Sequence, residues 1–198
     1  MNLVFFIRSA TVKLNRYTIK DIPGSSGRLD VISRCILSAI LSNNDFEKNV
    51  QIWVFLDRYG TFIFNPKFFN YEIFPKNELS FTDYCVKFLQ KSYNTKDLSL
   101  NLLSSIKDSE MNIIEAIKYF KQLNYNIYIL EEHGQDFFKL INSIHEKENI
   151  VFIIGSQEDE YIHSKELSAL KIPMISIGNQ SYLASSVIRL LKLYLLAL

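Results

Sequence analysis

The sequence predicts an α/β fold in which a parallel sheet is covered by helices on both faces. Short apolar runs alternate with longer segments whose apolar residues recur every three or four positions, as in strand–helix–strand units. The expected strands are apolar along their whole length, so both faces of the sheet should be buried. With 198 residues and 48% hydrophobic composition, we expect a single domain over residues 1–198 with an ample core.

The first half of the chain begins this alternation. The helix that follows the first strand carries Leu29, Ile32 and Ile36 on one face. In chain order we expect a strand at 3–7, that helix at 28–42, a strand at 50–57, a hairpin at 59–74 and a helix at 80–93.

Local signals mark the ends of two of these elements. Asn65 and Pro66 are the expected turn residues of the hairpin. Ser80 or Thr82 is the expected N-cap of the helix at 80–93. Residues 94–108 show neither pattern and are left unassigned.

The second half alternates more regularly. Helices are expected at 110–124, 135–147, 158–171 and 182–196, and strands at 125–130, 149–155 and 172–178. Because parallel strands bind ligands at their carboxyl ends, the loops that follow these strands should form one site. These loops are 131–134, 155–156 and 176–181.

Charge is unevenly distributed, although the net charge is only +1. Residues 1–40 hold six Lys or Arg against two acids, whereas residues 131–166 hold nine acids against three lysines. A basic N-terminal face would attract a polyanion such as RNA. An uneven solvated surface explains the charges equally well.

Several chemistries lack their motifs. Gly27 is followed by Arg28 and Leu29, so the glycine-containing stretch at 21–30 is no Walker A loop. The sequence contains no GxGxxG, HExxH, CxxC or GxSxG, which disfavours a dinucleotide site, a metal site and a serine hydrolase. The two cysteines, Cys35 and Cys85, are typical of reduced buried thiols.

The two ends of the sequence bear on the expected location of the protein. The first residues are too short for a signal peptide, and Arg189 and Lys192 interrupt the apolar C-terminal run. We therefore expect a cytoplasmic protein without a membrane segment. That C-terminal run is expected to be a helix buried in the fold or in a dimer interface.

Glycines mark all three strand-end loops, at Gly134, Gly155 and Gly178. Glycine lets backbone amides and carbonyls approach a ligand closely, and such a pocket with apolar walls suits an adenine ring. Simple turns after strands are the alternative explanation.

Four stretches together resemble the archaeal tRNA pseudouridine N1-methyltransferases. GSSGRLDVISRCILSAI (24–40) resembles that family's PGSAGRLDVLCRCVNSA signature. The family's later patterns resemble LEEHGQDF at 130–137, FIIGSQEDE at 152–160 and SIGNQSYLASSVIRLL at 176–191. The resemblance spans the chain from about residue 3 to the end, in the family's order.

This resemblance implies the SPOUT class of methyltransferase. Its parallel α/β sheet ends in a C-terminal deep trefoil knot, which periodicity does not reveal. It also implies a homodimer, S-adenosylmethionine as cofactor, and tRNA as substrate. The residues carried over to the cofactor pocket are Leu130, Gly134, Gly155, Ser156, Ser176, Ile177, Gly178, Tyr182, Leu183 and Val187.

The chain departs from the family pattern at some of these positions. Val187 replaces a family cysteine, and Ser156 and Gln157 replace an aspartate and a histidine. The residues at 183–186 read LASS where the family has H-A-D-H. Recognition of the cofactor by backbone groups is compatible with these changes, whereas side-chain roles at these positions are in doubt.

In the same family reading, the stretch DIPGSSGRLD (21–30) forms a wall of the substrate site and reaches toward the cofactor of a partner subunit. Arg28 would bind phosphate or the flipped base, and Asp30 would hydrogen-bond the uracil edge or accept the N1 proton. The alternative is a plain capped helix start, with Asp30 complementing the helix dipole. Further phosphate contacts are expected from Arg8, Arg16, Lys20 and Arg34.

The expected activity is therefore methylation of N1 of pseudouridine at position 54 in the T-loop of tRNA. The alternatives are a related rRNA pseudouridine N1-methyltransferase, a non-catalytic RNA-binding module with the same fold, and a flavodoxin-like nucleotide-binding protein.

Overall fold

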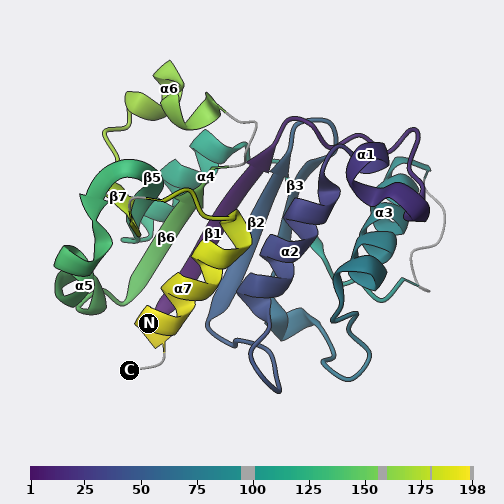
Figure 1. Cartoon of the computed structure of the whole chain (residues 1–198), viewed down its shortest axis with the longest axis horizontal. Coiled ribbons are helices and arrows are strands. Elements are labelled where there is room, and N and C mark those ends of the chain that lie inside the picture. The colour runs from purple at the N-terminus through teal and green to yellow at the C-terminus, as the bar shows by residue number, and fades with distance from the viewer. Residues whose placement is uncertain (95–100, 156–159, 179, 197–198) are drawn as a thin grey trace.

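The computed structural model describes residues 1–94, 101–155, 160–178 and 180–196, and within them a central sheet carries helices on both faces (Figure 1). The sheet has the strand order β4-β3-β2-β1-β6-β5-β7. Its strands are β1 (Asn2–Ser9), β2 (Val50–Leu56), β3 (Gly60–Phe64), β4 (Lys107–Ser109), β5 (Asn126–Asp136), β6 (Asn149–Ile154) and β7 (Met174–Ser176).

The predicted parallel sheet is confirmed for its central and C-terminal part. β1 pairs in parallel with β2 and β6, and β5 pairs in parallel with β6 and β7. At the other edge, β3 is antiparallel to both β2 and β4, so the whole sheet is mixed. The carboxyl ends of β5, β6 and β7 therefore meet on one edge of the sheet.

Helices cover both faces of this sheet. They are α1 (Ile22–Ser26), α2 (Leu29–Ile40), α3 (Glu78–Asn94), α4 (Ile113–Gln122), α5 (Phe137–His145), α6 (Lys165–Ser168) and α7 (Ala184–Leu196). Short 3-10 turns lie at Ile19–Asp21, Pro66–Phe68 and Glu160–His163. α2 and α7 pack side by side on one face, in front of the sheet in Figure 1. No helix within the described ranges is long and apolar enough to cross a membrane.

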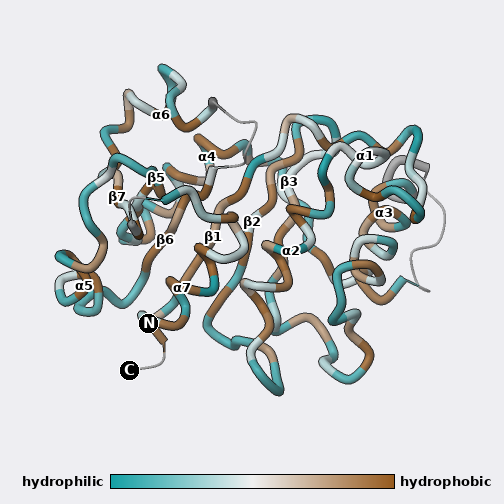
Figure 2. The backbone as a smooth tube through the Cα atoms, in the orientation of Figure 1, coloured by the Kyte–Doolittle hydropathy of each residue, from teal (hydrophilic) through white to brown (hydrophobic). Residues whose placement is uncertain are grey.

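The apolar strands separate two cores. Leu3, Phe5 and Ile7 of β1 point into the core beneath α2, α3, α5 and α7, whereas Val4 and Phe6 point into the core beneath α4 and α6. This alternation follows from the two-residue period of a strand. Figure 2 shows the strands as a mostly hydrophobic interior within a more polar outer chain. Cys35 and Cys85 are buried free thiols, as predicted.

The hairpin predicted at 59–74 is wrong. β3 ends at Phe64, and Pro66 then begins a 3-10 turn whose N-cap is Asn65, with its side chain accepting from the amide of Lys67 at 3.1 Å. β3 pairs instead with β2 before it and with β4, more than 40 positions later in the chain. Proline at the start of a turn fixes φ and removes a ladder donor, so no strand continues there.

The predicted N-cap of the helix at 80–93 also differs. The side chain of Asn77, rather than Ser80 or Thr82, accepts from the Ser80 amide at the start of α3, at 2.9 Å. Thr82 is buried; its hydroxyl donates to the Glu78 carbonyl at 2.7 Å and lies 2.8 Å from the Ser33 hydroxyl oxygen. The Thr82 hydroxyl therefore bonds within the fold and does not cap the helix.

The helix predicted at 158–171 is interrupted. A 3-10 turn at Glu160–His163 is followed by the short helix α6, and residues 156–159 lie outside the described ranges. Ser164 has extended backbone angles, and its hydroxyl accepts from the Leu167 amide at 3.3 Å. This N-cap starts a new helix and breaks the continuous helical period.

β5 does not stop before the 131–134 stretch as predicted. It continues to Asp136 with a shift in register, so that Leu130 and Gln135 both stand opposite Ile175 of β7. The four residues between them do not pair with β7, and the pairing resumes at the same residue of β7, Ile175. This local excursion shapes the edge of the sheet at which the expected site lies.

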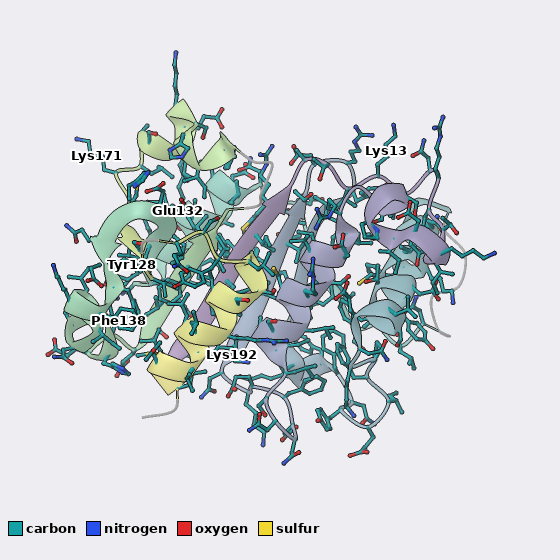
Figure 3. The ribbon with its side chains drawn as sticks, in the orientation of Figure 1. Lys13, Tyr128, Glu132, Phe138, Lys171 and Lys192 are labelled. Carbon is teal, nitrogen blue, oxygen red and sulfur yellow. The ribbon has the colours of Figure 1, made fainter. Side chains whose placement is uncertain are left out.

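The buried amine of Lys192 generates a prediction about pH. It donates to the carbonyls of Ser38 at 3.0 Å and Leu41 at 2.6 Å, and so ties α7 to the end of α2. Burial lowers the pKa of Lys192 from 10.5 to about 8, a shift that Glu47 opposes and Arg189 reinforces. Lys192 is labelled in Figure 3.

Between pH 8 and 10.5, the unfolded chain binds more protons at this lysine than the folded chain does, so folding stability rises with pH in that window. We expect the free energy of unfolding of the wild type to gain about 2 kcal/mol relative to Lys192→Met over that window. Urea denaturation of both proteins at pH 7.5 and 10.5 measures this difference. If the free energy of unfolding of the wild type does not rise relative to that of Lys192→Met between the two pH values, the assignment is contradicted.

Candidate functional site

The carboxyl ends of β5, β6 and β7 border a cavity of about 350 Å³. This volume lies in the range of small-molecule sites. The start of α7 and one face of α2 complete its wall. Apolar side chains make up much of the lining, from Val31, Leu130, Ile154, Ile162, Ile175, Ile177, Leu183, Ala184 and Val187. Polar groups come from Arg34, Glu131, Glu132, His163, Ser176, Gln180, Ser181, Tyr182 and Ser185.

The structure brings together most of the residues expected to hold a cofactor. Those that line the cavity are Leu130, Gly155, Ser176, Ile177, Gly178, Tyr182, Leu183 and Val187. Gly134 does not line it but packs against the backbone of the lining residue Ile175, and Ser156 lies outside the described residues. Three stretches of the chain, at residues 130, 155 and 176–187, thus meet at one cavity.

Gly134 allows the β5 excursion to lie directly against β7. A Cβ at this position would lie 2.6 Å from the backbone nitrogen and carbonyl carbon of Ile175. Real Cβ atoms do not approach backbone atoms so closely, so the residue must be glycine unless the chain moves. Gly134 therefore sets the distance between two walls of the cavity.

The third loop is held by its own hydrogen bonds. The hydroxyl of Ser176 donates to the carbonyl of Gly178 at 2.8 Å and accepts from the Gly178 amide at 3.2 Å. Ser176 is buried, and the loop begins at the last residue of β7. The backbone of 176–178 is thereby fixed beside the cavity, as recognition by backbone groups requires.

The side chains of Arg28, Asp30 and Arg34 form a charged cluster at the start of α2. Arg28 Nε lies 3.2 Å from Asp30 Oδ1, and an Arg34 terminal nitrogen donates to Asp30 Oδ2 at 2.9 Å. Asp30 is only 3% exposed, so a buried carboxylate is enclosed by two guanidinium groups. Arg34 also lines the cavity, and thus connects the cluster to the cofactor site.

Arg28 is held in an unfavourable backbone conformation. Its φ of 69° and ψ of 31° are left-handed, which costs a non-glycine residue on the order of 1 kcal/mol. Gly27 before it is also left-handed, and a Cβ there would collide with the carbonyl oxygen of Thr11. The Thr11 hydroxyl donates to the carbonyl of Gly27 at 2.9 Å. Close packing against the segment after β1 therefore fixes the stretch that presents Arg28.

The other basic residues expected to contact RNA lie apart from the cavity. Arg8 pairs with both carboxylate oxygens of Asp57, at 3.0 and 2.5 Å, and its guanidinium lies 4.3 Å from the ring centre of Tyr161. Arg16 and Lys20 are exposed on the segment that precedes α1. Arg34 is therefore the member of this group that the fold brings to the site.

The sequence patterns missed some residues of the site. Glu131 and Glu132 belong to the 131–134 stretch expected there and line the cavity, but no role was predicted for their side chains. Ile162 and His163 reach it from the 3-10 turn after β6, where a regular helix was expected. The ion pair of Arg34 with Asp30 can be predicted from the sequence, because Arg34 lies four residues after Asp30 on the same helical face. Within the described ranges, no group of three or more His, Cys, Asp or Glu side chains could hold a metal ion.

The chain matches a family of RNA methyltransferases over nearly its whole length. Residues 2–197 match the family model described as "Putative SAM-dependent RNA methyltransferase", and the chain belongs to this family. Similar curated proteins are the tRNA (pseudouridine(54)-N(1))-methyltransferases of Pyrococcus abyssi and Thermococcus onnurineus. The first is 32% identical over 91% of this chain and 90% of its own length, and the second 28% identical over 96% and 97%.

A solved structure has the same fold. It is Archaeoglobus fulgidus Nep1 bound to S-adenosylhomocysteine, with a TM-score of 0.64 and 16% identity, covering 98% of this chain and 97% of its own. These comparisons confirm the family that the four sequence stretches resemble.

The strain at Arg28 generates a prediction from two substitutions. Arg28→Gly and Arg28→Ala both remove the guanidinium, but only glycine adopts the left-handed conformation freely. We expect Arg28→Gly to be about 1 kcal/mol more stable than Arg28→Ala in urea denaturation. Equal stabilities would show that the backbone at residue 28 carries no strain.

The two strand-end glycines should differ in their tolerance of alanine. Gly134→Ala places a methyl group against the backbone of Ile175, whereas Gly155→Ala meets only the flexible Ile162 side chain, with its Cδ1 at 2.5 Å. We expect Gly134→Ala to lower the free energy of unfolding by about 2 kcal/mol and Gly155→Ala by about 1 kcal/mol or less. Chemical denaturation of both variants measures this order, and the reverse order contradicts the described packing.

Proposed function

We propose that this chain methylates N1 of pseudouridine at position 54 in the T-loop of tRNA, with S-adenosylmethionine as the methyl donor. The observation that carries the proposal is the meeting of eight expected cofactor residues at one cavity, in a chain 32% identical to a named enzyme of this activity. A tRNA-modifying enzyme of this kind would act in the cytoplasm.

The cavity fits the cofactor by its shape and its chemistry. Its apolar side chains, such as Leu130, Ile154 and Ile177, suit the faces of an adenine ring. The backbone at 176–178 is fixed by the Ser176 hydroxyl, which already bonds the Gly178 amide and carbonyl, so the amide and carbonyl of Ile177 would contact the ring edge. Gly134, outside the lining, would hold the cavity at its width. Ser156 belongs to the same proposed set of cofactor residues by resemblance alone.

The cofactor would supply a methyl group on a sulfonium sulfur: transfer to N1 would break the carbon–sulfur bond and release a neutral thioether, and the N1 proton would pass to water. The residues of the chain therefore have mainly to position N1 of the base and to exclude water. A base inside a folded tRNA loop must be extruded first, at a cost of a few kcal/mol. Phosphate contacts from Arg16 and Lys20, which are exposed, would offset this cost. The same contribution from Arg8 would require it to leave Asp57.

Arg28 and Asp30 would act at the base. The Arg28 side chain is 40% exposed, so its guanidinium can contact phosphate or the flipped base while Asp30 orients it. Both carboxylate oxygens of Asp30 already accept from arginines. This arrangement favours an orienting role for Asp30 over direct removal of the N1 proton.

We propose further that the C-terminal segment is threaded through the loop of β5 to make a trefoil knot. The pairing of Ile175 with residues on both sides of the 131–134 excursion supports this threading. The contact of Gly134 with the backbone of Ile175 supports it as well. Threading would place Tyr182, Leu183 and Val187 against the adenine pocket without a separate domain.

We also propose a homodimer formed through α7. Leu193 of this helix is 59% exposed and would be covered by a second copy of the chain. Burial of this surface against a second copy would bring the 21–30 stretch of one subunit toward the cofactor of the other.

The direct test is methylation of two tRNAs that differ only at position 54. With S-adenosylmethionine, the protein should methylate tRNA that carries pseudouridine 54 and leave the same tRNA with uridine 54 unmodified. Nucleoside mass spectrometry of the products identifies the methylated base. Gly155→Trp, which fills the cavity, should abolish the reaction while circular dichroism confirms that the variant is folded. Methylation of both tRNAs, or of ribose hydroxyls, would refute the proposed specificity.

A further inference from the structure

Arg34 contributes a positive charge to the lining of the proposed cofactor cavity. Among the described residues that line this cavity, it is the one lysine or arginine side chain. Its side chain is 32% exposed, and it projects from α2, which contributes only Val31 besides it to the wall. The cavity therefore has a single permanently positive group, at a defined position.

The guanidinium of Arg34 is held firmly but has donors to spare. One terminal nitrogen donates to Asp30 Oδ2 at 2.9 Å, and Nε lies 3.6 Å from Glu78 Oε2. That second distance is too long for a hydrogen bond, and Nε has no acceptor among the described residues. A guanidinium has five N–H donors. One of them donates to Asp30, the buried Nε has no acceptor, and the 32% exposure of the side chain leaves its other donors open to solvent or to a ligand in the cavity.

The other charges of the cavity indicate which ligand group belongs there. Glu131 and Glu132 lie on the same wall, at the end of β5, where Figure 3 labels Glu132. One guanidinium and two carboxylates in the lining of the same cavity complement a zwitterionic amino acid with a carboxylate and an ammonium. Repeated RNA phosphates would instead be repelled by the two glutamates. The amino-acid end of S-adenosylmethionine is such a zwitterion.

We propose that Arg34 binds the α-carboxylate at the methionine end of the cofactor, and that Asp30 positions Arg34 for this contact. Planar guanidinium groups bind carboxylates through two parallel hydrogen bonds, which fix orientation as well as position. This assignment rests on the proposed cofactor, and it replaces the expected phosphate contact of Arg34. It also links the motif at 21–30 to the cofactor within one chain, through Asp30.

Two ligands that differ in the amino-acid end test this assignment. S-adenosylhomocysteine carries the carboxylate, and 5′-deoxy-5′-methylthioadenosine has the same nucleoside thioether without it. Calorimetric titration of the wild type, Arg34→Gln and Arg34→Lys with both ligands separates the contact from general damage to the cavity. Arg189→Gln is the matched control, because Arg189 donates to the Ser38 hydroxyl of the same helix and does not line the cavity.

We expect Arg34→Gln to weaken S-adenosylhomocysteine binding on the order of 10- to 100-fold and to change methylthioadenosine binding less than about 2-fold. The affinity of Arg34→Lys for S-adenosylhomocysteine should lie between those of the wild type and Arg34→Gln, because an ammonium keeps the charge but cannot form two parallel hydrogen bonds. Asp30→Asn should weaken S-adenosylhomocysteine binding less than Arg34→Gln does. The double variant should lose no more than Arg34→Gln alone, because Asp30 acts through Arg34.

Three outcomes would overturn the assignment. Equal losses for both ligands would show that Arg34 only supports the cavity. Unchanged S-adenosylhomocysteine binding with weakened tRNA binding would return Arg34 to a phosphate contact. If the wild type bound neither ligand, the proposed cofactor itself would fail, and the assignment with it.

Discussion

The close approach of the β5 excursion to β7 is the constraint on which the rest of the site depends. Leu130 and Gln135 stand opposite the same residue, Ile175, and Gly134 between them lets the two backbones touch. A side chain at this point would push the strands apart and open the cavity that both of them line. The apolar wall, the fixed backbone after β7 and the entry of α7 all follow from this contact.

The second determinant is the buried ion cluster that joins α2 to the cavity. Asp30 is enclosed in the fold, yet both of its oxygens are satisfied by arginines that reach outward, Arg28 toward solvent and Arg34 toward the cavity. A buried carboxylate with two such partners is a rigid support for them. The motif that appears in the sequence as a helix start therefore connects a surface that suits RNA with a cavity that suits a nucleoside cofactor.

Much of this could be read from the sequence, and the failures share a physical cause. The apolar runs located β1, β2, β5, β6 and β7, because buried parallel strands are hydrophobic along their length. The family-like stretches located most of the cavity residues, because their backbone roles depend on glycine spacing. Local patterns could not reveal that β3 pairs with the distant β4, since that pairing depends on contacts far along the chain. Nor could they reveal that β5 leaves and rejoins its ladder at Ile175, or that Arg34 turns into the cavity.

The most direct test of the central claim is amide hydrogen exchange with and without S-adenosylhomocysteine. If the strand-end loops hold the cofactor, exchange should slow at 130–135, at 175–178 and in the first turn of α7, and remain unchanged in β3 and α3. Protection confined to another region, such as the groove beside Arg8 and Tyr161, or no protection at all, would contradict the account.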